Sequence, residues 1–193
     1  MRASSFDLVG YELVPDLIDS QTIKVLSVYY ENALRRGLMK PYEPITIENC
    51  TEIRWYADPF GETLLDLLKP KIEEVSGKKL FPTYSFFRVY RQGEELIAHT
   101  DRPSCEISVT ISIAQVGKIS RIWMQKGAEL PSNYELSPGS GVVYKGCDIL
   151  HWREKMTEGQ LVVQLMLHYV DKDGFNAEFK YDKRQNLGFP KET

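Results

Sequence analysis

Apolar residues recur at helical spacing in the first part of the chain, after a short opening segment. One face collects an apolar residue in each turn: Ile23, Leu26, Tyr30 and Leu34. Asp19 or Ser20 can cap the start of this stretch through a side-chain oxygen, and Gly37 can end it because glycine tolerates left-handed backbone. The pattern predicts an amphipathic packing helix.

A second helix is predicted to begin at Asp58 and Pro59, with Asp58 as its cap and Pro59 at the first helical position. Its apolar stripe consists of Leu64, Leu65, Leu68, Ile72 and Val75. Pro70 is expected to kink this helix, and Gly77 to stop it. Between the two helices, two short β-prone runs at 45–47 and 53–56 suit a loop and an edge strand.

From Phe81 onward the pattern changes to short β-rich runs, most of them separated by glycine turns. The predicted strands span residues 84–90, 107–113, 119–125, 141–144, 149–153 and 161–170. Two helices followed by such a run predict an α+β chain whose strands close into a sandwich or barrel. At 193 residues the chain suits one domain, with helical support at about 15–77, a strand core at about 81–170 and a C-terminal tail at 171–193.

Composition and charge narrow the classes of function. The chain is 42% apolar, and 24 Lys and Arg against 27 Asp and Glu give a formal charge of -3, so no nucleic-acid partner is expected. Because there is no run of about 18 apolar residues and no signal-peptide core, we expect a cytoplasmic protein without a membrane span. Cys50, Cys105 and Cys147 lack C-x-x-C spacing and are expected to be buried thiols. The oligomeric state stays open.

The residues that carry candidate chemistry are His99, Asp101 and His151. In a strand, residues i and i+2 point to the same side, so His99 and Asp101 can reach one metal ion together, and His151 can join them from another strand. Two imidazoles and one carboxylate, without a thiolate, suit iron(II) and leave its other coordination positions open. By spacing alone, a turn aspartate with two unrelated histidines is an equally good interpretation.

Two segments around these residues resemble the iron(II)- and 2-oxoglutarate-dependent oxygenases, in particular the prolyl-hydroxylase-like branch. The first, 84–102, has a strand ending in Tyr90, a turn at Gly93, and an H-x-D motif beginning nine residues after that tyrosine. The second, 138–154, is similar to the family's strand, loop and distal-histidine strand. The resemblance covers roughly residues 15–170.

This resemblance implies a double-stranded β-helix, which is a jelly roll with the metal at its open end. It implies that His99, Asp101 and His151 are the metal ligands and catalytic centre, with iron(II), 2-oxoglutarate and dioxygen as cofactor and cosubstrates. The implied reaction is that of a dioxygenase, with hydroxylation of an amino acid, a peptide side chain or another small molecule as the expected outcome.

The chain departs from the family at one position. The family usually places Arg or Lys about ten residues after the distal histidine, where it pairs with the far carboxylate of 2-oxoglutarate; here that position is Leu161. Since an unpaired buried carboxylate costs several kcal/mol, another group must meet it. Strand alternation puts Arg88 on the same face as Tyr90, whose family counterpart touches 2-oxoglutarate. Arg88 is therefore the first choice of anchor, and Tyr90 an expected contact of the cosubstrate.

Other basic and polar residues are weaker candidates. Arg153 shares the face of His151 and is the second choice of anchor, followed by Arg121 in a middle strand. Gln164 can offer 2-oxoglutarate a neutral hydrogen bond within the barrel. Arg102 directly follows Asp101, and for it a substrate contact and a surface salt bridge are equally open.

Two other functions remain open from the sequence. The missing basic residue at Leu161 leaves room for an iron oxygenase that does not use 2-oxoglutarate. A non-catalytic jelly-roll module that keeps a metal for stability or small-molecule recognition is the alternative from another class. His168, late in the last predicted strand, is expected to be a hydrogen-bonded core or rim histidine rather than a fourth ligand.

Overall fold

The computed structural model describes residues 5–39 and 53–189. In chain order its elements are α1 (Ser5–Val9), β1 (Tyr11–Val14), α2 (Ser20–Arg35), β2 (Ile53–Tyr56), α3 (Pro59–Ser76), β3 (Leu80–Tyr90), β4 (Leu96–His99), η1 (Pro103–Cys105), β5 (Ile107–Val116), β6 (Ile122–Lys126), β7 (Ser132–Tyr134), β8 (Gly141–Lys145), β9 (Ile149–Arg153), β10 (Leu161–Asp171) and η2 (Ala177–Lys183). The elements η1 and η2 are 3-10 helices. Within these residues, no helix has the length and apolar character to cross a membrane.

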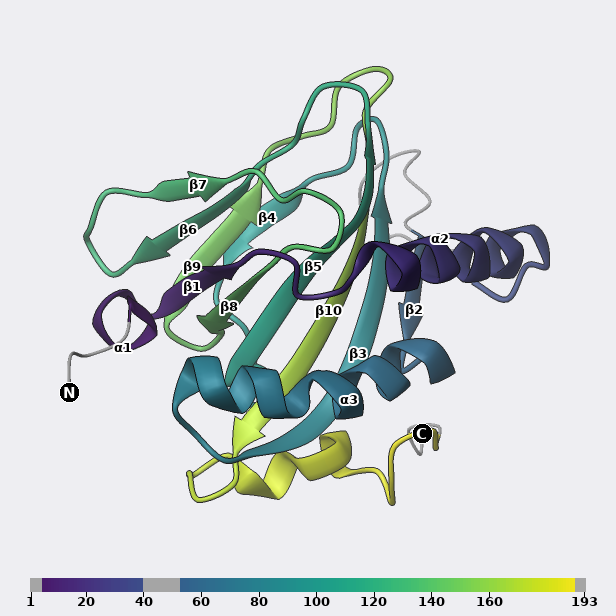
Figure 1. Ribbon diagram of the computed structural model, residues 1–193. Helices are drawn as coiled ribbons and strands as arrows, with labels where there is room; N and C mark the ends of the chain where they lie inside the picture. Colours follow the sequence, from purple (N-terminus) through teal and green to yellow (C-terminus); the bar gives the residue numbers. More distant parts are fainter. Residues whose placement is uncertain (1–4, 40–52, 190–193) are drawn as a thin grey trace.

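The strands form two antiparallel sheets (Figure 1). The larger sheet has the order β1-β8-β5-β10-β3-β2, and the smaller has the order β4-β9-β6-β7. Strands distant in sequence lie side by side in both sheets, as β8 does between β1 and β5, and these crossovers are typical of a jelly roll. The predicted α+β fold with a jelly-roll core is confirmed.

Helices α2 and α3 cover the outer face of the large sheet (Figure 1). Both start at the predicted caps, because the Asp19 carboxylate accepts the backbone N–H groups of residues 21 and 22, and Asp58 accepts those of residues 60 and 61. Helix α3 continues through Pro70 to Ser76 and ends at Gly77, whose φ of 68° is left-handed. The sequence thus predicted where both helices begin.

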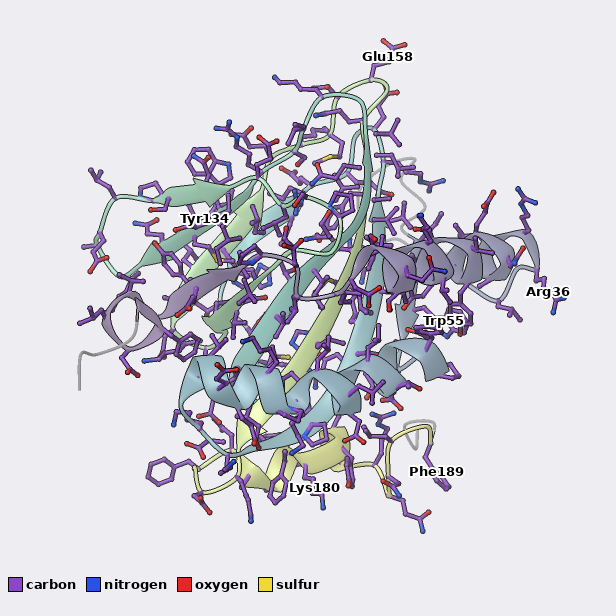
Figure 2. The ribbon with its side chains drawn as sticks, viewed as in Figure 1. Arg36, Trp55, Tyr134, Glu158, Lys180 and Phe189 are labelled. Carbon is purple, nitrogen blue, oxygen red and sulfur yellow. The ribbon has the colours of Figure 1, made fainter. Side chains whose placement is uncertain are left out.

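The prediction for α2 is wrong at one position of its apolar face, Leu34. The Leu34 side chain is 37% exposed, and the neighbouring Ala33 is buried in its place. Near this helix, Trp55 stacks on Tyr29 with ring centroids 6.1 Å apart, and Figure 2 shows Trp55 beside α2. This strand aromatic packs against a helix, away from the space between the sheets.

The main core lies between the helices and the large sheet. Leu26, Leu65, Phe87, Val109 and Leu165 are among its fully buried members. Two smaller apolar clusters fill the space between the sheets. One is built from Tyr11, Ile122, Met124, Leu136, Val142, Tyr144 and Ile149, and the other from Tyr90, Met156 and Val162 with Leu96 packed against them.

All six strands predicted after residue 81 are present, although the one predicted at 119–125 spans Ile122–Lys126. The predicted edge strand at 53–56 is β2, which pairs with β3, whereas the run predicted at 45–47 lies outside the described residues. The sequence missed β1, β4 and β7, each of which has only three or four residues. Such short strands have too few positions to show alternation.

The segment after β10 docks beneath α3 (Figure 1), and Figure 2 shows Lys180 and Phe189 on it. The Arg184 guanidinium forms an ion pair with Glu62 of α3 and donates to the carbonyl of Thr83 at 2.9 Å. The side chains of Arg184 and Glu62 are 1% and 3% exposed. The chain predicted as a C-terminal tail is therefore held by a buried charge pair.

Candidate metal centre

The register of the small sheet brings His99 and His151 together. His99 ends β4, His151 is the middle residue of β9, and the two are direct partners across the antiparallel pair. Asp101 follows just after β4, where its backbone N–H donates to the carbonyl of Gly146 at 2.8 Å, in the turn between β8 and β9. Backbone pairing thus unites the residues of the predicted ligand set, called the triad below.

One carboxylate oxygen of Asp101 faces both imidazoles. Its Oδ1 is 3.6 Å from Nε2 of His99 and 3.6 Å from Nε2 of His151. The two rings have centroids 4.3 Å apart, and one donor atom from each triad residue lies within 4.8 Å of the others. The three donor atoms therefore converge on one point.

The other nitrogen of each imidazole is tied to the backbone of its own strand. Nδ1 of His99 donates to the carbonyl of Ile97 at 2.7 Å, and Nδ1 of His151 donates to that of Ile149 at 3.0 Å. Since a neutral imidazole has one N–H, these bonds leave a lone pair on each Nε2. Backbone carbonyls fix the tautomer of metal-binding histidines in this way.

The electrostatics of the triad also favour metal binding. Burial raises the pKa of Asp101, but the hydrogen bond with the His99 side chain, the electrostatic influence of the nearby His168 and His151 and the hydrogen bond from Ser108 outweigh it, so the pKa is lowered and Asp101 is ionised. Burial lowers the pKa of His151 and keeps it neutral. The interaction with Asp101 raises the pKa of His99, so a metal ion at Nε2 would compete with a proton there.

The triad opens into a cavity of about 200 Å³ between the sheets. It is lined by Tyr84, Phe86, Arg88, Tyr90, Leu96, His99, Asp101, Thr110, Tyr144, His151, Met166 and His168. Of the two triad histidines that line it, His99 is closer to solvent, with a side chain that is 41% exposed, whereas that of His151 is only 4% exposed. The cavity joins the triad to a mixed wall of aromatic, apolar and basic side chains.

Arg88 and Tyr90 both line this cavity, as alternation along β3 predicts. The Arg88 guanidinium lies over the Tyr90 ring, 4.1 Å from its centroid, and Nη2 donates to the carbonyl of Glu95 at 3.1 Å. Arg88 is 8% exposed. A buried positive charge therefore stands in the wall of the cavity that contains the triad.

Arg153 lies behind that wall and is not one of the lining residues. Its guanidinium carbon is 5.6 Å from the centroid of the Tyr90 ring, and Nη1 donates to the backbone and side-chain oxygens of Ser120 at 2.9 and 3.0 Å. Burial lowers the pKa of Arg153 to about 10, so it stays charged at neutral pH. Among residues 5–39 and 53–189, no carboxylate forms an ion pair with it. Arg121 is 55% exposed near Glu135 and is not brought to the cavity.

The inner face of β10 carries no arginine or lysine. Leu161 packs with the helix-covered core, and the apolar positions that alternate with it lie on the same outer side, as predicted. The inner face contains Val162, Gln164, Met166 and His168. Gln164 is buried, and its amide donates to the hydroxyl of Thr110 at 3.2 Å. A neutral strand thus stands where the family usually has its basic partner.

Arg102 turns away from the cavity toward the C-terminal segment. Its Nη2 is 3.1 Å from Oδ2 of the buried Asp182, which also accepts a hydrogen bond from the hydroxyl of Tyr56 at 2.7 Å. The guanidinium also lies over the Tyr84 ring, 4.8 Å from its centroid. Of the two interpretations left open for Arg102, the geometry matches the salt bridge.

Three polar residues lie beside the triad, and the sequence missed the roles of two of them, Tyr144 and Ser108. The Tyr144 hydroxyl lies 3.5 Å from Nε2 of His151, whereas its core position pointed only to packing. Ser108 carries no motif, yet its hydroxyl donates to Asp101 Oδ2 at 2.8 Å. His168 is buried and hydrogen-bonded, as expected, and its partner is Ser108. Inward alternation on β5 and β8 is the signal that would have found the first two.

The cysteines follow the prediction only in part. Cys105 is buried 3.0 Å from the Tyr84 hydroxyl, and burial raises the pKa of its thiol to about 12. Cys147 is only half-buried, so the prediction is wrong for this residue. Cys50 lies outside the described residues.

Gly146 leaves room for the Asp101 carboxylate. A β-carbon at this position would lie 2.0 Å from the carbonyl oxygen of Cys105 and 2.6 Å from Asp101 Oδ2. We expect Gly146→Ala to lower the free energy of unfolding by about 1–3 kcal/mol, because buried backbone and the carboxylate would have to move. Urea denaturation measures this loss. Wild-type stability in the variant would contradict the close approach.

The residues present fit a divalent metal ion of intermediate hardness. The set offers two imidazole nitrogens and one ionised carboxylate oxygen, and it contains no cysteine. Three ligands on one side of a metal leave its other positions facing the cavity. The triad can therefore hold an ion that also binds small ligands.

Comparison with solved structures finds the same fold in non-haem oxygenases. The carbocyclase SnoK from nogalamycin biosynthesis, an α-ketoglutarate-dependent protein, aligns with a TM-score of 0.72 at 12% identity, over 87% of this chain and 82% of its own. A Pseudomonas putida prolyl-4-hydroxylase gives 0.65 at 13% identity, over 84% and 95%. EctD from S. alaskensis, solved with 2-oxoglutarate and 5-hydroxyectoine, gives 0.67 at 14% identity, over 86% and 74%.

By sequence alone, no protein-family profile matches the chain, and no curated protein is significantly similar to it. The resemblance inferred from the two segments is thus confirmed at the level of the fold, which this chain shares with iron(II)- and 2-oxoglutarate-dependent oxygenases.

Proposed function

We propose that this protein is a non-haem iron(II)- and 2-oxoglutarate-dependent dioxygenase that oxidises a small molecule or a peptide side chain. The observation that carries the proposal is the single Asp101 oxygen facing two Nε2 atoms whose partner nitrogens are bound to backbone carbonyls. The shared fold with proteins named for this chemistry supports it. Hydroxylation is the expected outcome.

Each part of the cavity has a role in this proposal. The triad holds iron(II), which together with 2-oxoglutarate supplies the oxidation of a C–H bond by dioxygen. Arg88 and Tyr90 hold the cosubstrate; Gln164 is the register partner of Arg88 on β10, and the Arg153 guanidinium carbon lies 5.6 Å from the centroid of the Tyr90 ring. The apolar side chains of Phe86, Leu96 and Met166 limit water beside the reacting atoms.

The direct test follows succinate, the product of 2-oxoglutarate. Protein loaded with iron(II) is incubated in air with 2-oxoglutarate, with and without candidate amino acids and peptides. Without a substrate we expect slow succinate formation, and with a true substrate we expect faster formation. Calorimetry with manganese(II) in place of iron measures 2-oxoglutarate binding without turnover. If the protein forms no succinate and also does not bind 2-oxoglutarate, the proposal is wrong.

Arg88→Met is expected to raise the dissociation constant of 2-oxoglutarate about 100-fold. Removing one partner of a buried, hydrogen-bonded charge pair costs about 2–5 kcal/mol, and about 3 kcal/mol corresponds to that factor. Calorimetry of the manganese-loaded protein measures the constant. Arg121→Met is the matched control and should bind like wild type, since Arg121 does not line the cavity. If Arg153→Met loses binding and Arg88→Met does not, Arg153 is the anchor.

The neutral inner face of β10 favours a second candidate, an iron oxygenase that does not use 2-oxoglutarate. Oxygen uptake measured with 2-oxoglutarate omitted separates the two, because only this candidate consumes oxygen under that condition. A protein that binds metal and gains stability from it, but never consumes oxygen, would instead be a non-catalytic binding module.

A further inference from the structure

Ser108 and His168 lie directly behind the triad, on the neighbouring central strands β5 and β10. They are register partners in the large sheet and are 0% and 5% exposed. The Ser108 hydroxyl oxygen is 2.8 Å from Asp101 Oδ2, 2.9 Å from His168 Nδ1 and 3.0 Å from the carbonyl oxygen of Cys105. A buried hydrogen-bonded chain therefore leads from β10 through β5 to Asp101.

The number of available protons determines which group donates in each of these hydrogen bonds. The Asp101 carboxylate and the Cys105 carbonyl can only accept, and the Ser108 hydroxyl has one proton to donate. That proton points to these acceptors, so the bond between Ser108 and His168 needs its proton from His168. Nδ1 of His168 must then carry hydrogen, whether the ring is neutral or charged. The ring donates to Ser108, and Ser108 donates to Asp101.

This chain occupies the Asp101 oxygen that does not face the histidines. Oδ2 accepts from Ser108, while Oδ1 alone lies 3.6 Å from each Nε2 of the triad. The backbone N–H of Asp101 is fixed as well, on the carbonyl of Gly146. If the carboxylate rotated to bring both of its oxygens to a metal, the hydrogen bond from Ser108 would break. The buried Ser108 hydroxyl would then lose this acceptor.

We propose that Ser108 and His168 are positioning residues that hold Asp101 as a one-oxygen metal ligand. The inference rests on the proposed metal-binding function and adds to it the groups that set how Asp101 binds. A carboxylate restricted to one oxygen leaves one more metal position for incoming ligands than a carboxylate bound through both. Partners of this kind, bonded to ligands rather than to the metal, typically change metal affinity about 10–100-fold.

Ser108→Ala tests the proposal, with Ser112→Ala as its matched control. Ser112 is a buried serine on the same face of β5, and its hydroxyl has no hydrogen-bond partner within the described residues. Titration with cobalt(II) gives the affinity, and the absorption bands of the cobalt protein report its coordination geometry. We expect Ser108→Ala to bind about 10–100-fold more weakly with shifted bands. Ser112→Ala should match wild type in both.

Two replacements of His168 separate its hydrogen-bond donor from its bulk. Asparagine and leucine have nearly the same shape, but only the asparagine amide can place an N–H near the position of Nδ1. His168→Asn is expected to keep the wild-type cobalt spectrum, and His168→Leu to shift it in the direction of Ser108→Ala. A role confined to packing would give both variants the same spectrum.

Nitrogen-15 NMR of the unaltered protein reads the tautomer of His168 without any variant. Hydrogen on Nδ1 is the expected result, and a lone pair there overturns the inference. Equal cobalt affinity and spectra in Ser108→Ala and Ser112→Ala also overturn it, while leaving the metal site in place. If wild-type protein binds no metal at all, the proposed function fails, and the inference fails with it.

Discussion

His99→Ala is expected to abolish metal-dependent stabilisation and succinate formation while leaving the protein folded. A structural metal site with four ligands contributes about 10–16 kcal/mol, or about 2.5–4 kcal/mol per ligand, so losing one should weaken binding about 100–1000-fold. The His99 side chain is 41% exposed at the end of a short strand, so little packing is lost with it. The effect should therefore appear in binding and not in the stability of the metal-free protein.

Thermal unfolding with and without manganese(II) measures this effect. Metal at about 100 times its dissociation constant stabilises a folded protein by about 2.7 kcal/mol, and His99→Ala should lose that increment. Thr100→Ala is the control, because Thr100 lies between two triad residues but is exposed and absent from the cavity wall. An unchanged metal-dependent shift in His99→Ala would contradict the assignment of this ligand.

Arg184→Met is expected to lower the free energy of unfolding by about 3–5 kcal/mol. The substitution leaves Glu62 buried without its cationic partner, and an uncompensated buried charge is among the most destabilising defects known. Urea denaturation monitored by tryptophan fluorescence measures the change as a shift of the midpoint. The C-terminal segment should detach first, because Arg184 also binds the carbonyl of Thr83.

The matched control is an exposed pair in α2. Nη2 of Arg35 lies 2.5 Å from Oε1 of Glu31, but the two side chains are 72% and 59% exposed. Arg35→Met should therefore lower the free energy of unfolding by less than about 1 kcal/mol. Removing both buried charges, as Arg184→Met with Glu62→Leu, should recover part of the loss. Similar costs for Arg184→Met and Arg35→Met would show that the buried pair does not hold the segment.

The features of the fold that depend on residues close together in the sequence were predictable. The caps Asp19 and Asp58 act on residues two and three positions away, and the alternation that put Arg88 and Tyr90 on one face holds within a single strand. The residue types of the triad made it a candidate, but spacing alone left unrelated residues an equally good interpretation, and the resemblance of the two segments to a known family favoured the metal site. Local rules reached the candidate ligands and one wall of the cavity.

Contacts between distant residues were beyond the reach of these rules. Glu62 and Arg184 are separated by 122 residues, and Ser108 and His168 by 60. Neither pair has a sequence signature, because any buried acid or serine can find a partner only once strand order and register are known. The inward face of the last strand was predicted correctly, yet the partners of its residues on β5 were not.

We expect strand β4 to open more readily than the other strands that position the triad. This strand of four residues lies at the edge of the small sheet, has β9 as its one partner among the strands that the structure describes, and has an irregular register between Leu96 and His99. Short edge strands open in local fluctuations that cost less free energy than global unfolding. His151 lies on β9, between β4 and β6, and Asp101 accepts the buried hydrogen bond from Ser108, so His99 is the proposed ligand that we expect to detach first. Metal would then enter and leave through fraying of this edge, at a rate that amide hydrogen exchange over residues 96–99 reports.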